Sequence, residues 1–402
     1  MKKSVKDLGD IKGKRALVRV DINVPLDENK NVTDDTRIQA IIPTIRFLQE
    51  KGAKIILMAH LGRPKGEVKP EFSLLPAAKK LSEVLGENVL FVTTPVGDEG
   101  IENELAQLKN GQVALLENIR YYKAEEAKDD DMTFANKLAK LGDFYVNDAF
   151  GAAHRNHTST AKLAKVLKPA VSGLLTEKEL RCLGDALNNP QRPFTAIVGG
   201  AKVSTKIGVL ENLIDKVDNL IIGGGMAYTF VKANGGKIGN SICEDDQMDI
   251  AKEAEKKAAE KGVKIVMAKD VLATDDFSGN GTNKFVDVTE IPDGFEGVDA
   301  GPETRKAFAD VIKASKTILW NGPVGAFEND KFTEGTKEVA LAVQEATKNG
   351  AVSVLGGGDT VAAVKKYKLD PDSFTHISTG GGASLEFIEG KVLPGIDALD
   401  DK

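Results

Sequence analysis

Short apolar segments alternate along the whole chain with polar or glycine-rich turns and with helical patterns. This alternation is typical of βαβ units, in which strands buried on both faces of a parallel sheet are apolar throughout. The first half contains ALVRVDINVP, KIILMAHLGRP, QVALLENIRYY and FYVNDAFGAAHRNHTST. The second half contains FTAIVGGAKVSTK, NLIIGGGMAYTF, TILWNGPVGAFE, VSVLGGGDTVAAV and HISTGGGASLEF. The pattern predicts an α/β protein with a parallel sheet in each half.

The length of the chain predicts two domains, because one hydrophobic core seldom organises 402 residues. A helix is expected to join them. Thr176 and Glu179 form a T-x-x-E capping box, three leucines follow at helical spacing, and Asn188, Asn189 and Pro190 end the pattern. We therefore place the domain boundary along this helix.

The composition is ordinary for a globular protein and argues against several classes. A net charge of −6 without a dominant basic patch is atypical of a nucleic-acid-binding protein. No apolar run approaches the roughly 20 residues that span a bilayer, and the first residues lack the apolar core of a secretory signal. Cys182 and Cys243 are expected to be reduced thiols of a cytoplasmic protein. The four histidines form no HExxH motif or Cys/His cluster, so no zinc site is predicted.

The turns after the predicted strands differ between the two halves. Those of the first half carry Arg, His, Asn and Asp, whereas those of the second half consist of glycine with Lys and Asp beside it. Ligands of open α/β sheets bind at the carboxyl ends of the strands. Each half is therefore expected to hold one site, and the two sites to face each other across a cleft.

The glycine-rich turns of the second half predict phosphate binding. A turn of this kind that opens a helix presents free backbone N–H groups and the positive end of the helix dipole. Glycine also serves tight turns that bind nothing, so the prediction rests on five such turns in one sheet. No GxxxxGK[ST] or GxGxxG motif is present, which argues against a P-loop or a dinucleotide site.

Charged side chains beside these turns are suited to a polyphosphate and its metal. Lys202 and Lys206 are four residues apart and would share one face of a helix, although both can equally be surface lysines. Asp359 directly follows a GGG turn and is a candidate Mg²⁺ ligand, because Mg²⁺ takes few protein ligands and shares its shell with phosphate and water. Asp359 can also act as a helix N-cap.

Arginine is concentrated in the first half, where seven of the ten arginines lie at or before Arg155. Arg63, Arg120 and Arg155 each follow an apolar strand, and Arg37 begins a helical pattern. Any one of them can form a surface salt bridge. Four at equivalent strand or helix ends indicate a cluster that grasps a small anion with several charged groups, since guanidinium binds phosphate and carboxylate in a bidentate manner.

Three other polar residues accompany this cluster. His60 follows one of the strands and is as often structural as catalytic in such a position. Asp21 and Asn23 stand one residue apart at a strand end, where their side chains can accept from and donate to a substrate hydroxyl.

Seven motifs in this order resemble the phosphoglycerate kinase family: VRVDINVP, MAHLGRP, NDAFGAAHR, GGAKVSTK, WNGPVGAFE, GGGDT and STGGGASLEF. The resemblance extends from about residue 15 to about residue 390. It implies two Rossmann-like domains, each a doubly wound parallel sheet, joined by a hinge helix with a cleft between them. It also implies a C-terminal tail that returns to the N-terminal domain. The boundaries that follow are 1–172, 173–190 for the hinge, 191–385, and 386–402 for the tail.

The implied reaction is reversible phosphoryl transfer from 1,3-bisphosphoglycerate to MgADP, giving 3-phosphoglycerate and MgATP in glycolysis. The family assigns phosphoglycerate binding to Asp21, Asn23, Arg37, His60, Arg63, Arg120 and Arg155. It assigns nucleotide binding to Gly200, Lys202, Lys206, Asn321, Glu328, Gly357, Gly358, Asp359 and Thr360, with Asp359 on Mg²⁺. Arg37, Lys202, Lys206 and the turn of Gly380, Gly381 and Gly382 would act on the transferred group.

Three residues depart from the family pattern: Ile22 where phenylalanine is usual, Ala59 where serine is common, and Ala326 in place of a bulkier apolar residue. None of them removes a charged group, so they affect nucleotide affinity rather than activity. Because carboxylate and ADP oxygens are already deprotonated at neutral pH, the transfer needs no general base. It needs in-line positioning and neutralised charge, and closure of the domains to bring the substrates together.

Two other classes of protein are compatible with a two-domain α/β frame. An NAD-dependent dehydrogenase is disfavoured by the missing GxGxxG turn, and an exported binding protein for small anions by the missing signal. The expected partners are the small-molecule substrates alone, without nucleic acid or membrane, and the expected state is a cytoplasmic monomer.

Overall fold

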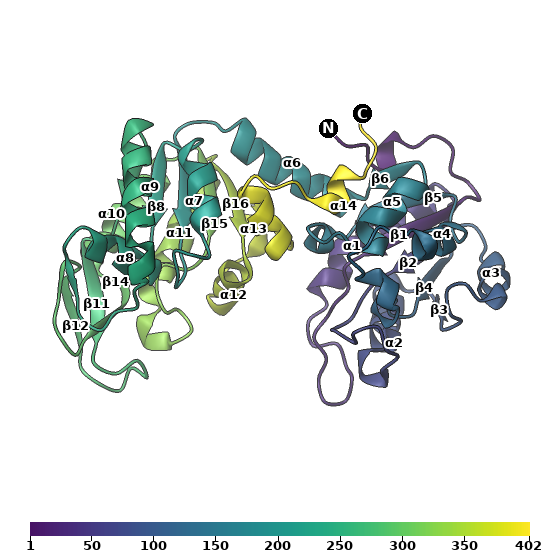
Figure 1. Ribbon diagram of the computed structural model, residues 1–402, viewed down its shortest axis with the longest axis horizontal. Coiled ribbons are helices and arrows are strands. Elements are labelled where there is room, and N and C mark those ends of the chain that lie inside the picture. Colours follow the sequence, from purple (N-terminus) through teal and green to yellow (C-terminus); the bar gives the residue numbers. More distant parts are fainter. The chain divides into compact units, whose positions relative to one another are not determined.

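The computed structural model describes residues 1–402, which form two compact units. The first unit comprises Met1–Leu180 and Val392–Lys402, and the second comprises Arg181–Lys391. The division falls within helix α6 (Leu174–Asn188) (Figure 1). No helix is both long and apolar enough to cross a membrane.

The first unit is built on a sheet of six parallel strands in the order β3-β4-β2-β1-β5-β6. The central strand, β1, pairs with β2 on one side and β5 on the other. The strands are β1 (Arg15–Val20), β2 (Lys54–Met58), β3 (Val89–Val92), β4 (Val113–Leu116), β5 (Phe144–Asp148) and β6 (Ala170–Ser172). Strands β1, β2, β4 and β5 are almost entirely buried, as the continuous apolar segments predicted. The two edge strands, β3 and β6, were not among the predicted segments.

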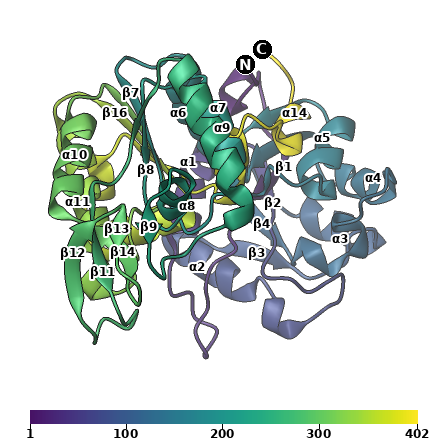
Figure 2. The same ribbon diagram turned by 60° about the vertical axis from the view of Figure 1, so that its left-hand side comes forward.

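Helices cover both faces of this sheet (Figure 2). Alternate residues of β1, such as Val18 and Val20, share one core with Ile41 and Ile45 of α1 because successive strand residues point to opposite faces. That core continues into α2. The helices of the unit are α1 (Thr36–Glu50), α2 (Leu75–Leu85), α3 (Glu99–Ala106), α4 (Thr133–Ala139), α5 (Leu163–Val166) and α14 (Pro394–Asp397).

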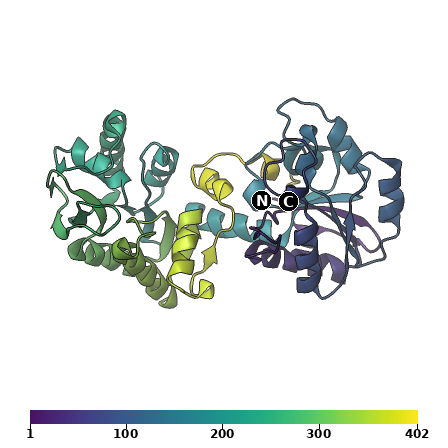
Figure 3. The ribbon, with the colours of Figure 1, turned by 90° about the horizontal axis from the view of Figure 1, so that it is seen from below.

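The last residues of the chain add to the first unit, so the N- and C-termini lie side by side (Figure 3). Lys3 N–H donates to the Asp400 carbonyl at 2.8 Å, and Asp400 N–H donates to the Ala170 carbonyl at 2.9 Å. The Asn147 side chain at the end of β5 donates to the Gly395 carbonyl at 3.0 Å. The C-terminal segment is thereby bonded to the start of β6 and to the end of β5.

The second unit also has a parallel sheet of six strands, in the order β10-β8-β7-β15-β16-β17. Its strands are β7 (Phe194–Val198), β8 (Asn219–Ile222), β10 (Lys264–Val266), β15 (Thr317–Asn321), β16 (Val352–Gly356) and β17 (His376–Ile377). Counted within the sheet, the order is 3-2-1-4-5-6, that of a doubly wound Rossmann sheet. The two parallel sheets confirm the predicted fold class. The strand order reverses between β7 and β15, which is where such sheets bind ligands.

Two groups of helices enclose this second sheet. Phe308 and Ile312 of α10 and Val343 of α11 pack on Ile197 and Trp320 of the strands. The helices are α7 (Ile207–Ile214), α8 (Met226–Ala233), α9 (Met248–Glu260), α10 (Pro302–Lys313), α11 (Glu334–Lys348), α12 (Gly358–Lys366) and α13 (Gly382–Ile388). Helix α7 contacts α9 and α13, and α8 contacts α9, so these four helices form one group. Helices α10 and α11 contact each other and form the second group.

A small antiparallel sheet in the second unit is absent from the sequence-based prediction. It has the order β12-β11-β14, and a separate parallel pair joins β13 to β9. The strands are β9 (Lys237–Ile238), β11 (Asp270–Thr274), β12 (Asn283–Asp287), β13 (Glu290–Ile291) and β14 (Glu296–Ala300). They are short, and β12 alternates between exposed and half-buried residues, so no continuous apolar run marks them.

Helix α6 begins two residues before the predicted capping box, so that prediction is wrong. Thr176 and Glu179 lie inside the helix and are buried. The cap comes from Asp148 at the end of β5, whose Oδ1 accepts from the backbone N–H groups of Leu175 at 3.0 Å and Thr176 at 3.2 Å. A residue distant in sequence thus does what the local motif was expected to do. The helix ends at Asn188, as predicted.

Candidate active site

The candidate residues of the first unit lie at the carboxyl ends of adjacent parallel strands. Asp21 and Asn23 follow β1, His60 and Arg63 follow β2, Arg120 follows β4, and Arg155 follows β5. Arg37 is the second residue of α1 and is therefore at a helix N-terminus, as predicted. Because parallel strands end at the same edge of a sheet, all of these residues belong to one edge.

Arg37 is held by Asp21. Its Nη1 donates to Asp21 Oδ2 at 2.5 Å, and the Arg37 side chain is 40% exposed. Asp21 Oδ1 accepts from the Asn23 N–H at 3.3 Å, and Asn23 Oδ1 accepts from the Gly62 N–H at 3.0 Å. Asp21 therefore holds the Arg37 side chain, and Asn23 holds the loop that carries Arg63.

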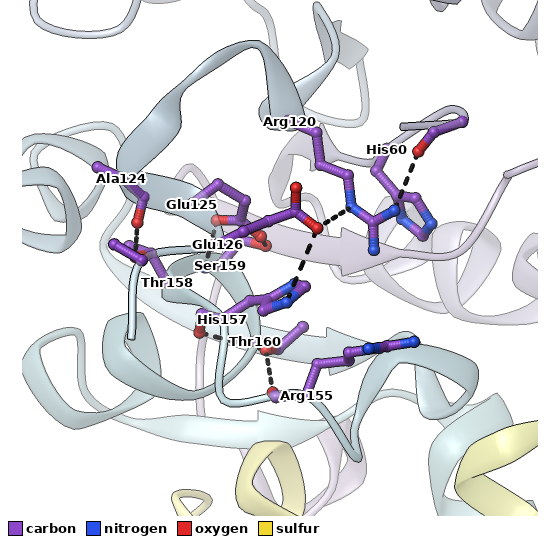
Figure 4. A network of polar contacts seen from close by, with 12 residues as sticks. His60, Arg120, Ala124, Glu125, Glu126, Arg155, His157, Thr158, Ser159 and Thr160 are labelled. Atoms are coloured by element: carbon purple, nitrogen blue, oxygen red, sulfur yellow. Dashed lines mark hydrogen bonds and ion pairs between the residues drawn. The ribbon is translucent and has the colours of Figure 1, made fainter. Parts of the chain in front are cut away.

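The other arginines differ in burial. Arg120 is buried and donates from Nη1 to the Gly62 carbonyl at 3.0 Å, with its Nε 3.4 Å from Glu126 (Figure 4). Burial lowers the pKa of Arg120, and the carboxylate of Glu126 opposes that shift. Arg63 and Arg155 are exposed. The edge thus presents one fixed guanidinium beside two that can reach a ligand.

His60 is buried and neutral. Burial is the largest cause that holds its pKa well below the ordinary value, followed by the charges of Arg19, Arg120 and Arg37. Arg19 Nη2 lies 2.9 Å from His60 Nδ1. Because arginine only donates, Nδ1 is the acceptor and the ring hydrogen is on Nε2.

Sequence reasoning missed three charged or polar residues beneath this edge. Arg19 is fully buried in β1, and an arginine inside the apolar run ALVRV was a signal that could have revealed it. Glu125 is also fully buried, and burial raises its pKa to about 7. His157 Nε2 lies 3.9 Å from Glu126 Oε1, and burial lowers the pKa of His157 to about 3. No local pattern marks Glu125 or His157.

In the second unit, all five glycine-rich turns follow strands of the one parallel sheet, namely β7, β8, β15, β16 and β17, as predicted. Three of these turns crowd against each other. A Cβ added to Gly199 would lie 2.0 Å from the Pro323 carbonyl oxygen. A Cβ added to Gly322 would lie 2.2 Å from the Gly199 carbonyl oxygen, and one added to Gly224 would lie 2.7 Å from the Gly200 carbonyl oxygen. These glycines therefore allow close packing of turns at the point where the strand order reverses.

The turn after β16 is open instead. Gly357, with φ +92°, is the N-cap of α12, and a Cβ on Gly358 would meet nothing within 4 Å. Asp359 is exposed in the first helical turn, so it is not the N-cap residue. Thr360 is buried and its Oγ1 accepts from the Gly322 N–H at 2.8 Å. The open helix N-terminus is suited to an anion.

Lys206 bridges from α7 to the end of β15. It is the N-cap residue of α7, and its Nζ donates to Asn321 Oδ1. Burial lowers the pKa of Lys206, while the carboxylates of Asp359 and Glu389 act in the opposite direction. The Asn321 side-chain nitrogen is buried and has no partner, and it would lie 3.1 Å from a Cβ on Gly357. Lys206, Asn321 and the open turn therefore converge.

Lys202 does not share a helix face with Lys206, so that expectation is wrong. Residues 201–206 are not helical, and α7 begins only at Ile207. The reason is local: Gly200 has φ +134°, and the Lys206 N–H bonds to the Val203 carbonyl. Lys202 is exposed on this loop.

The remaining candidates of the second unit lie on two loops. Glu328 is exposed, and its carbonyl accepts from Lys366 Nζ at 2.9 Å. Gly380 is buried, and its N–H already donates to Ser378 Oγ at 3.1 Å, whereas Gly381 is the N-cap of α13. Ile22 and Ala59 are fully buried, so they belong to the core rather than to the edge. No group of three or more His, Cys, Asp or Glu side chains could hold a metal ion.

The sequence and the fold match known proteins over nearly the whole chain. The family model described as phosphoglycerate kinase matches residues 5–391. A phosphoglycerate kinase from Nostoc sp. is 54% identical over 402 residues, which is 100% of this chain and 99% of the relative.

Two solved structures have the same fold. The phosphoglycerate kinase from Coxiella burnetii has a TM-score of 0.91 and 41% identity, covering 99% of this chain and 98% of that one. The one from Pyrococcus horikoshii OT3 has a TM-score of 0.81 and 32% identity with the same coverage. The chain belongs to the phosphoglycerate kinase family.

Proposed function

We propose that the edge of the first sheet holds the phosphoglycerate and the edge of the second sheet holds MgADP or MgATP. As a member of its family, the chain is a kinase that transfers a phosphoryl group reversibly between 1,3-bisphosphoglycerate and ADP. The best support for placing the two substrates on different sheets is the difference in side chains between the two sheet edges. Guanidinium groups gather at one edge, and open glycine turns with Lys206 gather at the other.

The phosphoglycerate carries a phosphate and a carboxylate or acyl phosphate. Arg63 and Arg155 are exposed and can form bidentate contacts with these groups, while Arg120 adds a fixed positive charge. His60 is neutral and offers its Nε2–H as a donor. Asp21 and Asn23 act by orienting Arg37 and the Gly62 loop.

The nucleotide phosphates would lie at Gly357, Gly358 and Thr360, where the N-terminus of α12 is open. The donor set fits a magnesium ion that shares its shell with phosphate and water, because Asp359 offers an exposed carboxylate and no protein cage is needed. When bound, Mg²⁺ neutralises phosphate charge. Gly200, Lys202 and Asn321 would complete the phosphate site, and Glu328 would contact the ribose.

The transfer step requires no general base, because both nucleophiles are already anionic. Arg37 and Lys206 neutralise charge on the moving phosphoryl group, together with the N-terminus of α13. The Gly380 N–H is engaged by Ser378, so Gly381 and Gly382 are the donors that we assign to this role. Since the substrates bind different units, the units must approach each other for transfer.

We assign the active state to a monomer that acts in the cytoplasm on small molecules alone. Analytical ultracentrifugation of the pure protein at assay concentration tests the first part. A single species of one chain mass supports it, and a stable dimer contradicts it.

A coupled assay for acyl-phosphate formation from 3-phosphoglycerate and MgATP tests the proposed function. The protein should turn over only when 3-phosphoglycerate, ATP and Mg²⁺ are all present. Turnover with a different phosphoryl acceptor and none with 3-phosphoglycerate would contradict the proposal.

A further inference from the structure

A buried carboxyl group lies behind the edge of the first sheet that carries the arginines, and it is not one of the residues assigned to substrate. Glu125 ends the short helix η4 (Lys123–Glu125) and is fully buried. Its Oε2 accepts from the Ser159 N–H at 2.9 Å, and its Oε1 lies 2.5 Å from Ser159 Oγ. Ser159 is in the π-helical segment η6 (Thr158–Lys162) and is equally buried (Figure 4).

The direction of each hydrogen bond here is fixed by Arg19. Arg19 Nε donates to Ser159 Oγ at 2.8 Å, so that oxygen is an acceptor and its own hydrogen goes to Glu125 Oε1. Arg19 Nη2 donates to His60 Nδ1 at 2.9 Å. An unbroken chain of hydrogen bonds therefore runs from Glu125 through Ser159 and Arg19 to His60.

This chain also balances charge. Arg19 and Glu125 are both fully buried, and a buried guanidinium is costly unless it is paired. The remaining nitrogen of Arg19, Nη1, donates to the Val20 carbonyl. The positive charge of Arg19 favours the ionised form of Glu125 and so opposes the burial that raises the pKa of Glu125 to about 7. The largest charge effects on His60 come from Arg19, Arg120, Arg37 and His157, and all of them disfavour its protonation.

We propose that Glu125 is a positioning residue for His60, acting through Ser159 and Arg19 to hold the ring with its hydrogen on Nε2. The ring then presents a donor, and never an acceptor, to the bound phosphoglycerate. The proposal for Glu125 rests on the proposed function in one respect only, the contact of His60 with the substrate. The position of the ring hydrogen in the free enzyme does not depend on the proposed function.

The state of the ring is measured by ¹⁵N NMR of the histidine side chains in the free full-length enzyme. The four histidines are separated by recording a His60→Gln variant, which loses one pair of signals. In the wild type, His60 should show a protonated Nε2 and a hydrogen-bonded, unprotonated Nδ1. A wild-type His60 protonated on Nδ1 would overturn the proposal whatever the variants do.

Glu125→Gln and Ser159→Ala should each move the Nδ1 signal of His60 towards that of a free ring nitrogen. The matched control is Glu126→Gln, which removes the same charge one residue along, where the carboxylate contacts Arg120 and His157 instead. It should leave the Nδ1 signal in place. Unchanged His60 signals in folded Glu125→Gln and Ser159→Ala would overturn the proposal.

Kinetics separate this proposal from the proposed function. Glu125→Gln and Ser159→Ala should raise KM for 3-phosphoglycerate about tenfold and leave KM for ATP unchanged, because a misplaced donor weakens one hydrogen bond to one substrate. A shifted Nδ1 signal with an unchanged KM for 3-phosphoglycerate would sustain the chain of hydrogen bonds. It would contradict the placement of His60 at the substrate.

Discussion

Arg37 and Lys206 are each held by a neighbouring polar side chain. Asp21 fixes the Arg37 guanidinium, and the Asn321 amide oxygen accepts from Lys206. A charge that is already in place does not have to be reorganised when the phosphoryl group moves, and this is how preorganised groups stabilise a transition state.

Arg37→Ala and Lys206→Ala should each reduce kcat on the order of 10²-fold, as the loss of one charge partner of a transition state does. Steady-state kinetics at saturating substrates measure the effect. Lys252→Ala is the control, since Lys252 is an exposed lysine of α9. Near-normal kcat in both site variants would remove these residues from the transfer step.

The glycine-rich turns of the second unit contain two kinds of glycine. Gly199, Gly224 and Gly322 lie where turns pack backbone against backbone, whereas Gly358 lies at an open helix N-terminus. Sequence reasoning assigned all of them to phosphate. The structure shows that part of the glycine content shapes the turns, and that the turn after β16 stays open at the N-terminus of α12.

Gly199→Ala should lower the free energy of unfolding by at least about 2 kcal/mol, because its Cβ would lie 2.0 Å from a backbone oxygen that cannot move freely. Gly184→Ala is the matched control: Gly184 is inside α6 with nothing within 4 Å of the added Cβ. It should raise the free energy of unfolding by about 0.5–1 kcal/mol. Urea unfolding measures both, and equal stability of the two variants would contradict the packing of the turns.

The cap of α6 makes stability depend on pH. Burial raises the pKa of Asp148 to about 7, partly opposed by hydrogen bonds from Thr44, Thr176 and Leu175. The folded state therefore binds a proton that the unfolded state has released, and the stability that this proton confers is lost as pH rises towards and through 7.

Asp148→Asn should remove this dependence while keeping an oxygen for the α6 N–H groups. Between pH 5 and pH 8 the free energy of unfolding of the wild type should fall by about 2–3 kcal/mol more than that of the variant. The reason is that the pKa of Asp148 is about 7 in the folded protein and has its ordinary, much lower value in the unfolded chain. Urea titrations at both values test it. Glu125 and Asp299 have pKa values raised in the same direction and remain in both proteins. If the free energy of unfolding of the wild type and of Asp148→Asn changed with pH by the same amount, Asp148 would not be the group that binds the proton.

Nine of the twelve strands of the two parallel sheets were predicted from sequence because buried parallel strands are continuous apolar runs, as in β2 and β15. The other three, β3, β6 and β10, lie at sheet edges and were not among the predicted segments. The antiparallel sheet could not, since β12 alternates at the surface and its pairing depends on the fold. The candidate site was predictable where a residue directly follows a strand, as for His60 and Arg120. Glu125 and the Asp148 cap were not, because their partners Ser159 and Leu175 are distant in sequence.

At the scale of the whole molecule, the proposed division of the substrates between two units predicts a change of shape during the cycle. Small-angle scattering should show a smaller radius of gyration only when 3-phosphoglycerate and MgATP are both present, because only then can both sites contact the transferred group. Each substrate alone is the control. A radius that stays the same in all four states would contradict closure.

The central claim is that the first unit binds the phosphoglycerate and the second binds the nucleotide. Equilibrium titration of two variants tests it most directly, Arg155→Ala and Asp359→Ala, both of which change exposed side chains. Arg155→Ala should weaken 3-phosphoglycerate binding about tenfold and leave MgATP binding unchanged, whereas Asp359→Ala should do the reverse. Loss of affinity for the same substrate in both variants, or for neither substrate in either variant, would contradict the account.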